Sequence, residues 1–235
     1  MKRLAALATL LLAGCASKVE HPKADAAWFE PVTSPLPPCS DPEPIGGELT
    51  VHLVRDRSLT DASLARVVGE LAGYWEGQGL TLRPGTVRVV DLPGLFEPPL
   101  DPRPLRSFLD THARPPGDGV LVVLVPRLWP AGVRLPPAAG LAVTAGGHAD
   151  VAGPEVQQAL GEAPATPTAF VSWDGFIHSD PARVFRGAAA HEVGHLLGLP
   201  HVDGEGDLMG APGACVPSLD AEQRATVRAS LSRRR

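Results

Sequence analysis

The chain lacks a long apolar segment, an excess of basic residues and any internal repeat. Its apolar run from Leu4 to Ala13 is too short for a mature helix that crosses a bilayer, which needs about 20 residues. The 21 lysines and arginines are outnumbered by 26 acidic residues, whereas nucleic-acid recognition relies on basic side chains. A transmembrane helix, a repeat array and a nucleic-acid interface are therefore not expected.

The N-terminus has the pattern of an export signal. Two basic residues precede the apolar run, as in secretory signal peptides. The run ends in Leu12-Ala13-Gly14-Cys15, which resembles the lipobox of bacterial lipoproteins. This resemblance implies that residues 1–14 are removed and that Cys15 carries a lipid anchor, so the protein is exported and attached to a bacterial membrane. An ordinary signal peptide with an incidental cysteine is the alternative.

The expected mature chain begins with a proline-rich segment. Ala16 follows the cysteine, and the absence of an aspartate there favours the outer membrane if the source is Gram-negative. Residues 15–47 contain the lipidated cysteine and many prolines, and such a segment is semi-extended without a core of its own. We therefore expect a tether over residues 15–47 and one folded domain over residues 48–235.

The most informative segment begins at His191 and has the form HExxHxxGxxH. His191 and His195 are four residues apart, so they share one face of a helix and can bind one metal ion. Gly198 can end the helix in the left-handed conformation, after which His201 can return as a third ligand. Three protein ligands leave a position open, as in catalytic zinc sites. Glu192 lies beside them, suited to act as a base on a metal-bound water.

A simpler interpretation of this segment is an amphipathic helix with two surface histidines and a capping glycine. That interpretation explains neither Glu192 nor His201. The sequence therefore predicts one catalytic Zn2+ ion held by the three histidines.

Downstream of these histidines, Met209 follows His201 by eight residues, within Asp207-Leu208-Met209-Gly210. At this point the chain resembles the metzincin metallopeptidases, which combine HExxHxxGxxH with a methionine-containing turn, the Met-turn. The spacing is most similar to the matrixin branch, with the archaemetzincins as a second candidate. The resemblance implies peptide-bond hydrolysis, with Met209 as an apolar floor under the zinc-binding histidines.

The chain departs from the metzincin pattern at two places. Val202 follows the third histidine, where several subfamilies have a characteristic residue, and it fits none of them. Some metzincins use a tyrosine after the Met-turn as a ligand or hydrogen-bond donor, but the only tyrosine of this chain is Tyr74. We therefore expect no tyrosine in the catalytic chemistry.

The hydrophobic pattern predicts an α+β fold. By resemblance it is a metzincin-like fold with a mixed, mostly parallel twisted sheet, two long helices including the zinc helix, and a small C-terminal subdomain that contains the Met-turn and a final helix. The expected strands are residues 48–56, a strand within 80–92, 120–125, 140–145 and 169–173. The expected helices run from Thr60 or Asp61 to Gly77 and over residues 105–113, 182–197 and 218–230. Ser179-Asp180-Pro181 is expected to begin the zinc helix, and Ser218 to cap the last one.

The resemblance also implies a substrate cleft. The strand Gly140-Leu141-Ala142-Val143 is expected at the edge of the sheet, where it would pair with an extended substrate backbone; a buried structural strand is the alternative. Residues 210–216 are expected to form a wall of the cleft. His148, Asp150 and His178 resemble part of the matrixin structural-zinc loop, although solvated loop residues are the default interpretation.

Cys39 and Cys215 have three possible roles. An exported compartment permits disulfides, so these two cysteines are expected to pair. Alternatively, Cys39 lies in a segment that loosely resembles the matrixin cysteine switch, in which a propeptide thiolate blocks the zinc. That motif's arginine and glycine are missing here. Two free thiols are the remaining possibility.

The expected function is that of a monomeric zinc endopeptidase that cleaves an extended protein substrate at the cell envelope. The main alternative is a catalytically idle lipoprotein with the same fold and a binding or structural role in the envelope. Intact Glu192 argues against this alternative, because loss of that carboxylate is the simplest route to an inactive protein. A zinc hydrolase that acts on a non-peptide amide is a third possibility.

Overall fold

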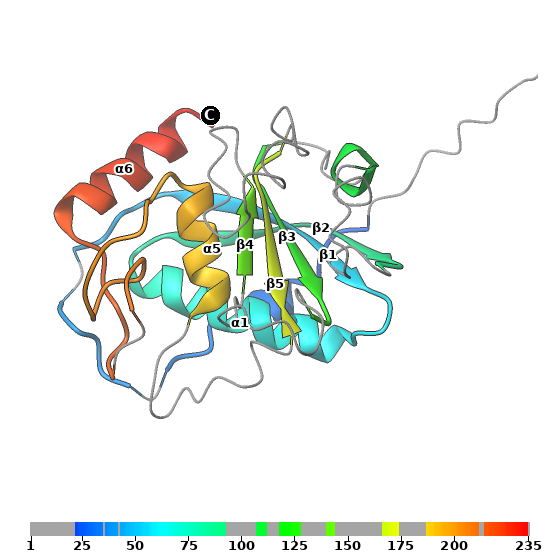
Figure 1. The fold of residues 1–235 in the computed structure, drawn as a ribbon, viewed down its shortest axis with the longest axis horizontal. Helices are drawn as coiled ribbons and strands as arrows, with labels where there is room; N and C mark the ends of the chain where they lie inside the picture. The colour runs from blue at the N-terminus through cyan, green and yellow to red at the C-terminus, as the bar shows by residue number, and fades with distance from the viewer. Residues whose placement is uncertain are drawn as a thin grey trace, which may run out of the picture.

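The structure is a mixed α/β fold in which one sheet is backed by helices (Figure 1). The computed structural model describes residues 22–34, 36–41, 43–92, 107–111, 118–127, 140–143, 166–173, 187–211 and 214–234. The sheet has five strands in the order β2-β1-β3-β5-β4. Their bounds are β1 Glu48–Asp56, β2 Thr81–Val90, β3 Val120–Val125, β4 Gly140–Val143 and β5 Thr168–Ser172.

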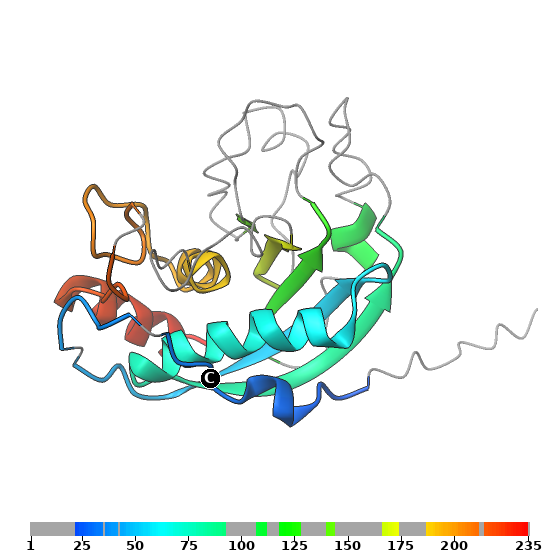
Figure 2. The same ribbon diagram turned by 90° about the horizontal axis from the view of Figure 1, so that it is seen from below.

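Four of these strands run parallel and one runs antiparallel. β1 pairs in parallel with β2 and β3, and β3 pairs in parallel with β5. β4 pairs antiparallel with β5 and forms the edge of the sheet. Figure 2 shows that the sheet is strongly twisted and curved. The predicted mixed, mostly parallel sheet is confirmed.

The strands owe their position to apolar residues on both faces of the sheet. Every residue of Val120–Val125 is buried, as expected for a central parallel strand. Leu53 of β1 and Val171 of β5 belong to the main core under the helices. Phe170 alternates to the opposite face, where its ring packs on Phe108 from residues 107–111 with centroids 5.6 Å apart. The sheet is therefore covered on both sides at β3 and β5.

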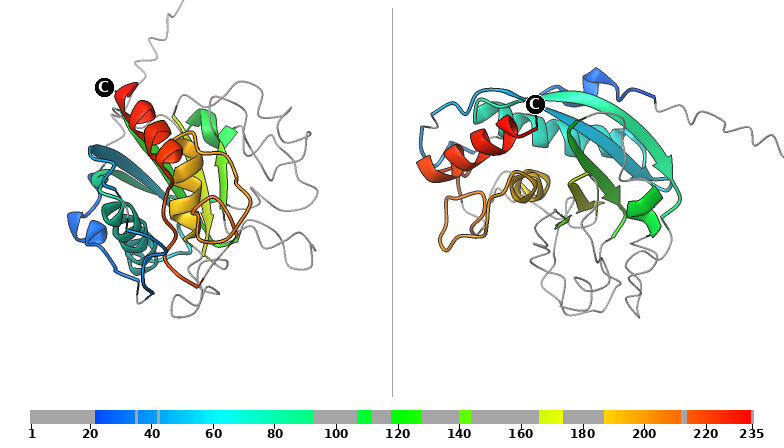
Figure 3. Two further views of the ribbon diagram at one scale, coloured as in Figure 1. Left: turned by 90° about the vertical axis from the view of Figure 1, so that its left-hand side faces the viewer. Right: turned by 90° about the horizontal axis from the view of Figure 1, so that it is seen from above.

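Two helices pack on the concave face of the sheet, as Figures 2 and 3 show. Helix α1, Asp61–Gly77, begins after Thr60, whose Oγ1 accepts a hydrogen bond from Ser63 N at 3.1 Å. The predicted start and end of this helix are confirmed. Helix α5, Ala188–Leu196, carries the first two histidines of the motif and packs against β4 and β5. No helix in the described part of the chain combines the length and apolarity that a bilayer crossing requires.

Two predicted helix boundaries were wrong. The zinc helix was predicted over residues 182–197, but α5 is Ala188–Leu196 and has nine residues. It is therefore shorter than α1, which has 17 residues. Gly187 precedes α5 without a side-chain cap, and Ser179 lies outside the described residues. The last helix, α6, is Ala221–Ser232, capped by Asp220 and not by Ser218.

Asp220 caps α6 through a reciprocal pair of hydrogen bonds with Gln223. Asp220 Oδ1 accepts a hydrogen bond from Gln223 N at 2.8 Å, and Gln223 Oε1 accepts one from Asp220 N at 2.8 Å. This reciprocal capping box satisfies two backbone donors at once. The hydroxyl of Ser218 instead lies 2.7 Å from Ser40 Oγ, so it helps to join two segments that are distant in sequence.

Most of the expected tether is residues 22–47, which we call the N-terminal strap and describe without residues 35 and 42. The strap lies along the domain, with hydrogen bonds from Val32 N to Gly69 O at 2.9 Å and from Ile45 N to Gln78 O at 2.8 Å. Its short helix η1, Ala26–Phe29, buries Phe29. A proline-rich segment cannot build a core alone, but its extended backbone can bond to a core that already exists.

The strap approaches α1 so closely that a side chain at Gly73 has no room. A Cβ at Gly73 would lie 2.2 Å from the carbonyl oxygen of Val32, whereas a Cβ at Gly77 would meet nothing within 4 Å. We expect Gly73→Ala to lower the free energy of unfolding by about 1–3 kcal/mol through overpacking. Gly77→Ala should change it little or raise it by up to about 1 kcal/mol, because alanine favours helix. Urea unfolding of both variants checks this, and equal effects would contradict it.

Candidate metal centre

The local sequence of α5 places two histidines on one face and then reverses the chain. After Leu196 the helix ends in a Schellman motif, in which Leu199 N donates to Gly194 O at 3.0 Å and Gly198 N donates to His195 O at 2.9 Å. Gly198 has φ 93°, the left-handed conformation that this motif needs. The predicted glycine stop is confirmed, and it returns His201 toward the helix.

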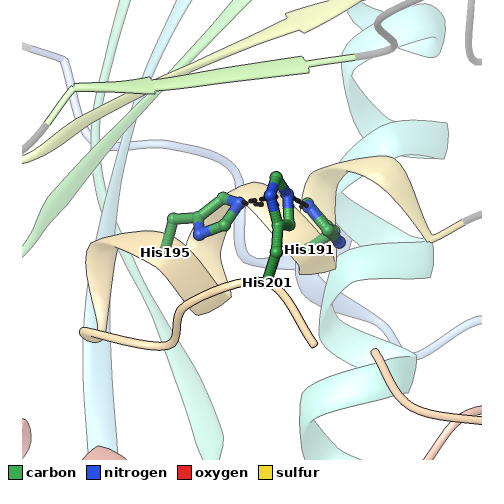
Figure 4. A group of neighbouring side chains, drawn as sticks. All are labelled: His191, His195 and His201. Carbon is green, nitrogen blue, oxygen red and sulfur yellow. Dashed lines mark hydrogen bonds between the residues drawn. The ribbon is translucent and has the colours of Figure 1, made fainter. Parts of the chain in front are cut away.

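The three histidines of the motif converge on one point (Figure 4). The Nε2 atoms of His191, His195 and His201 lie 3.1 Å from one another in all three pairs. His195 is buried, His191 is half-buried and His201 is exposed. In the described part of the chain, these residues form the one group of three metal-ligating side chains. The predicted clustering of the three ligands is therefore confirmed.

Backbone carbonyls fix the orientation of two of these rings. His191 Nδ1 donates to Leu208 O at 2.7 Å, and His195 Nδ1 donates to Leu199 O at 2.8 Å. A carbonyl only accepts, so Nδ1 carries the proton in both neutral rings and Nε2 presents a lone pair. Lone pairs that face one another at this distance repel. A cation held between them removes that repulsion, and carbonyl partners of this kind are usual around metal-bound imidazoles.

The site fits a divalent transition-metal ion. A triangle with 3.1 Å sides would allow one ion to bind all three nitrogens at about 2.0–2.1 Å, the usual zinc–imidazole distance. Imidazole binds zinc, copper, iron and nickel. The geometry thus supports a metal site without fixing which metal it takes.

Glu192 directly follows the first ligand on α5. The residue is 7% exposed, so a potential proton acceptor is largely desolvated one position after the first histidine. A carboxylate so placed is suited to general base catalysis. Its role as the base stays a prediction.

Met209 packs against α5 at Gly194. It is 1% exposed, and its Sδ would lie 2.7 Å from a Cβ at Gly194. The thioether therefore packs directly on the backbone of α5 between the two histidines. Sequence reasoning overlooked Gly194. The available signal was a glycine inside a helix, which costs about 1 kcal/mol relative to alanine and often marks a close approach.

A disulfide joins the strap to the loop after Met209. Cys39 and Cys215 are bonded, with Cα atoms 5.1 Å apart and a sequence separation of 176. Cys39 N also donates to Val216 O at 2.8 Å, and Val216 N donates to Pro37 O at 2.8 Å. With Cys39 in this bond, it offers no free thiolate for a cysteine switch. The predicted pairing is the one that the structure has.

The other predicted site residues are placed as follows. The strand Gly140–Val143 is at the edge of the sheet, where α5 packs against it. Tyr74 is on α1, where burial, followed by the charge of Asp207, raises its pKa well above the usual value. Cys15, His148, Asp150, His178 and residues 212–213 of the expected cleft wall lie outside the described residues.

Comparison with known proteins does not add to this geometry. No protein-family model matches the chain, and no characterised protein matches its sequence. The mixed α/β fold of the protein brings three histidines together in a group that could hold a metal ion.

Proposed function

We propose that the protein is a zinc-dependent endopeptidase of metzincin type that hydrolyses internal peptide bonds of extended protein substrates. One observation carries the proposal: three imidazole Nε2 atoms lie 3.1 Å from one another in all three pairs. The spacing HExxHxxGxxH and the resemblance to matrixins and archaemetzincins support zinc as the metal.

The residues of the site suggest how hydrolysis proceeds. Zinc, when bound, supplies Lewis-acid polarisation of water and of the substrate carbonyl. Glu192 accepts a proton from the attacking water and delivers it to the leaving amine nitrogen. Leu208 O and Leu199 O hold the rings of His191 and His195 in place through Nδ1, so these groups need no rearrangement during the reaction.

The edge strand supports an extended substrate. β4 pairs with β5 on one side and ends the sheet on the other. An exposed strand edge can bind an extended peptide through backbone hydrogen bonds, and β4 adjoins α5, which carries the proposed base. We therefore infer that the substrate backbone lies along Gly140–Val143.

Export and lipid anchoring are part of the proposal. They rest on residues 1–15 and are supported by the disulfide, because disulfides persist mainly in oxidising compartments. We expect Cys15→Ala to move the protein from the membrane fraction to the soluble fraction of cells, as judged by fractionation and immunoblotting. Unchanged membrane association of this variant would contradict a lipid on Cys15.

A peptide-library digest tests the proposed activity. Zinc-loaded protein that begins after Cys15 is incubated with a broad library of unstructured peptides, and the products are identified by mass spectrometry. We expect cleavage at internal bonds that stops on removal of zinc by a chelator and returns on its addition. A zinc-loaded protein that leaves the library intact would contradict the proposal and favour a binding or structural role in the envelope.

A further inference from the structure

The carbonyl that orients His191 belongs to a tight turn. Leu208 O accepts from His191 Nδ1, and the turn around it is closed by Asp207. Asp207 Oδ1 accepts a hydrogen bond from Met209 N at 2.8 Å, and Asp207 O accepts one from Gly210 N at 3.2 Å. The position of the Leu208 carbonyl therefore depends on the Asp207 side chain.

Gln223 of α6 ties this turn to the rest of the domain. Its Nε2 donates to Asp207 Oδ1 at 3.0 Å, while its Oε1 accepts from Asp220 N at 2.8 Å. The residue is 5% exposed, so both ends of a buried amide are used. A side chain that serves only as a helix cap has no need of the bond to Asp207.

The shared oxygen of Asp207 makes this connection a strong one. One carboxylate oxygen accepts from both Met209 N and Gln223 Nε2, and hydrogen bonds to a charged acceptor are stronger than neutral ones. Burial of Gln223 reduces the competition from water. An unbroken series of contacts thus leads from α6 through Gln223, Asp207 and Leu208 O to a proposed metal ligand.

We propose that Asp207 and Gln223 are positioning residues that hold the His191 ring in its metal-binding orientation. The inference rests on the metal centre of the proposed function and is independent of peptidase activity. Loss of a group that hydrogen-bonds directly to a metal ligand typically lowers metal affinity by about 10–100-fold, and Asp207 and Gln223 act on such a group, the Leu208 carbonyl.

Substitution of Asp207 gives the first test. Asp207→Ala removes the acceptor for Met209 N and Gln223, and we expect zinc to bind about 10–100-fold more weakly. Asp207→Asn keeps an oxygen acceptor, so its affinity should stay within about threefold of the wild type. Zinc affinity is measured by competition with a chromophoric chelator, and the melting temperature of each metal-free protein is recorded alongside.

Gln223→Glu gives a second test that does not depend on the folding of Asp207→Ala. The glutamate keeps an acceptor for Asp220 N but loses the donor and places a second carboxylate against Asp207. We expect zinc affinity to fall at least about tenfold. Leu231→Ala is the control, because it removes a buried side chain from the far end of α6 and should lower the melting temperature without changing zinc affinity.

The possible results separate this inference from the proposed function. Wild-type zinc affinity in both Asp207→Ala and Gln223→Glu would overturn the inference, even if both melt at lower temperatures. An equal loss of affinity in Leu231→Ala would also overturn it, because general destabilisation would then explain the effect. A wild-type protein that fails to bind zinc would instead contradict the proposed function.

Discussion

Glu192→Gln should stop peptide hydrolysis and leave the metal bound. The substitution keeps the size of a residue that is 7% exposed, but an amide cannot accept the proton of the attacking water. Loss of a general base typically lowers a rate by about 10²–10⁴-fold. We expect a decrease of this size in kcat, measured on any peptide that the wild type cleaves.

Two controls make this result specific. Glu205→Gln removes an exposed carboxylate from the segment that follows α5 and should retain wild-type activity. Zinc content and melting temperature of Glu192→Gln should equal those of the wild type, because the three Nε2 ligands are intact. Undiminished hydrolysis by Glu192→Gln would rule out Glu192 as the base, and loss of its zinc would point to a structural role.

Removal of the disulfide should have the largest effect on stability. The disulfide joins Cys39 and Cys215 across a sequence separation of 176, and loss of a native disulfide typically costs about 2–5 kcal/mol. We expect a decrease of that size in the free energy of unfolding of Cys39→Ala/Cys215→Ala, measured by urea denaturation. The two backbone hydrogen bonds between the strap and Val216 should then open more often, because the disulfide no longer holds the two segments together.

A reducing agent provides the matched comparison. It should weaken the wild type to about the level of the double variant and should leave the double variant unchanged. Hydrogen exchange should show faster exchange at the amides of Cys39 and Val216 in the reduced protein, because these two amides donate the hydrogen bonds between the strap and this loop. If oxidised, reduced and substituted proteins unfold with the same free energy, the bond contributes no stability.

Strongly patterned segments of this chain could be predicted from sequence. The apolar run Val120–Val125 is a buried strand with the predicted bounds, because its residues favour a strand that is covered on both faces. Thr60 caps α1 as predicted. The clustering of the histidines also follows from local geometry, since a helix spacing and a glycine stop bring the three side chains together.

Features that depend on distant contacts could not be predicted in this way. Composition indicated a semi-extended segment at residues 22–47, but it could not show that the backbone of Val32 bonds to Gly69 of α1. Asp220 displaced Ser218 as the cap of α6 because Gln223 completes a capping box. No local sequence pattern predicts that the same Gln223 side chain also donates a hydrogen bond to Asp207, which is 16 residues away in sequence.

The coordination of zinc tests the central claim most directly, because the claim is a catalytic metal centre built from three histidines. X-ray absorption spectroscopy of the zinc-loaded protein should show three imidazole nitrogens and one further light-atom ligand, at about 2.0–2.1 Å, and no sulfur. Alanine substitution of His191, His195 or His201 should each remove one imidazole from the signal. A spectrum with sulfur at about 2.3 Å, or one unaffected by these substitutions, would contradict the proposed centre.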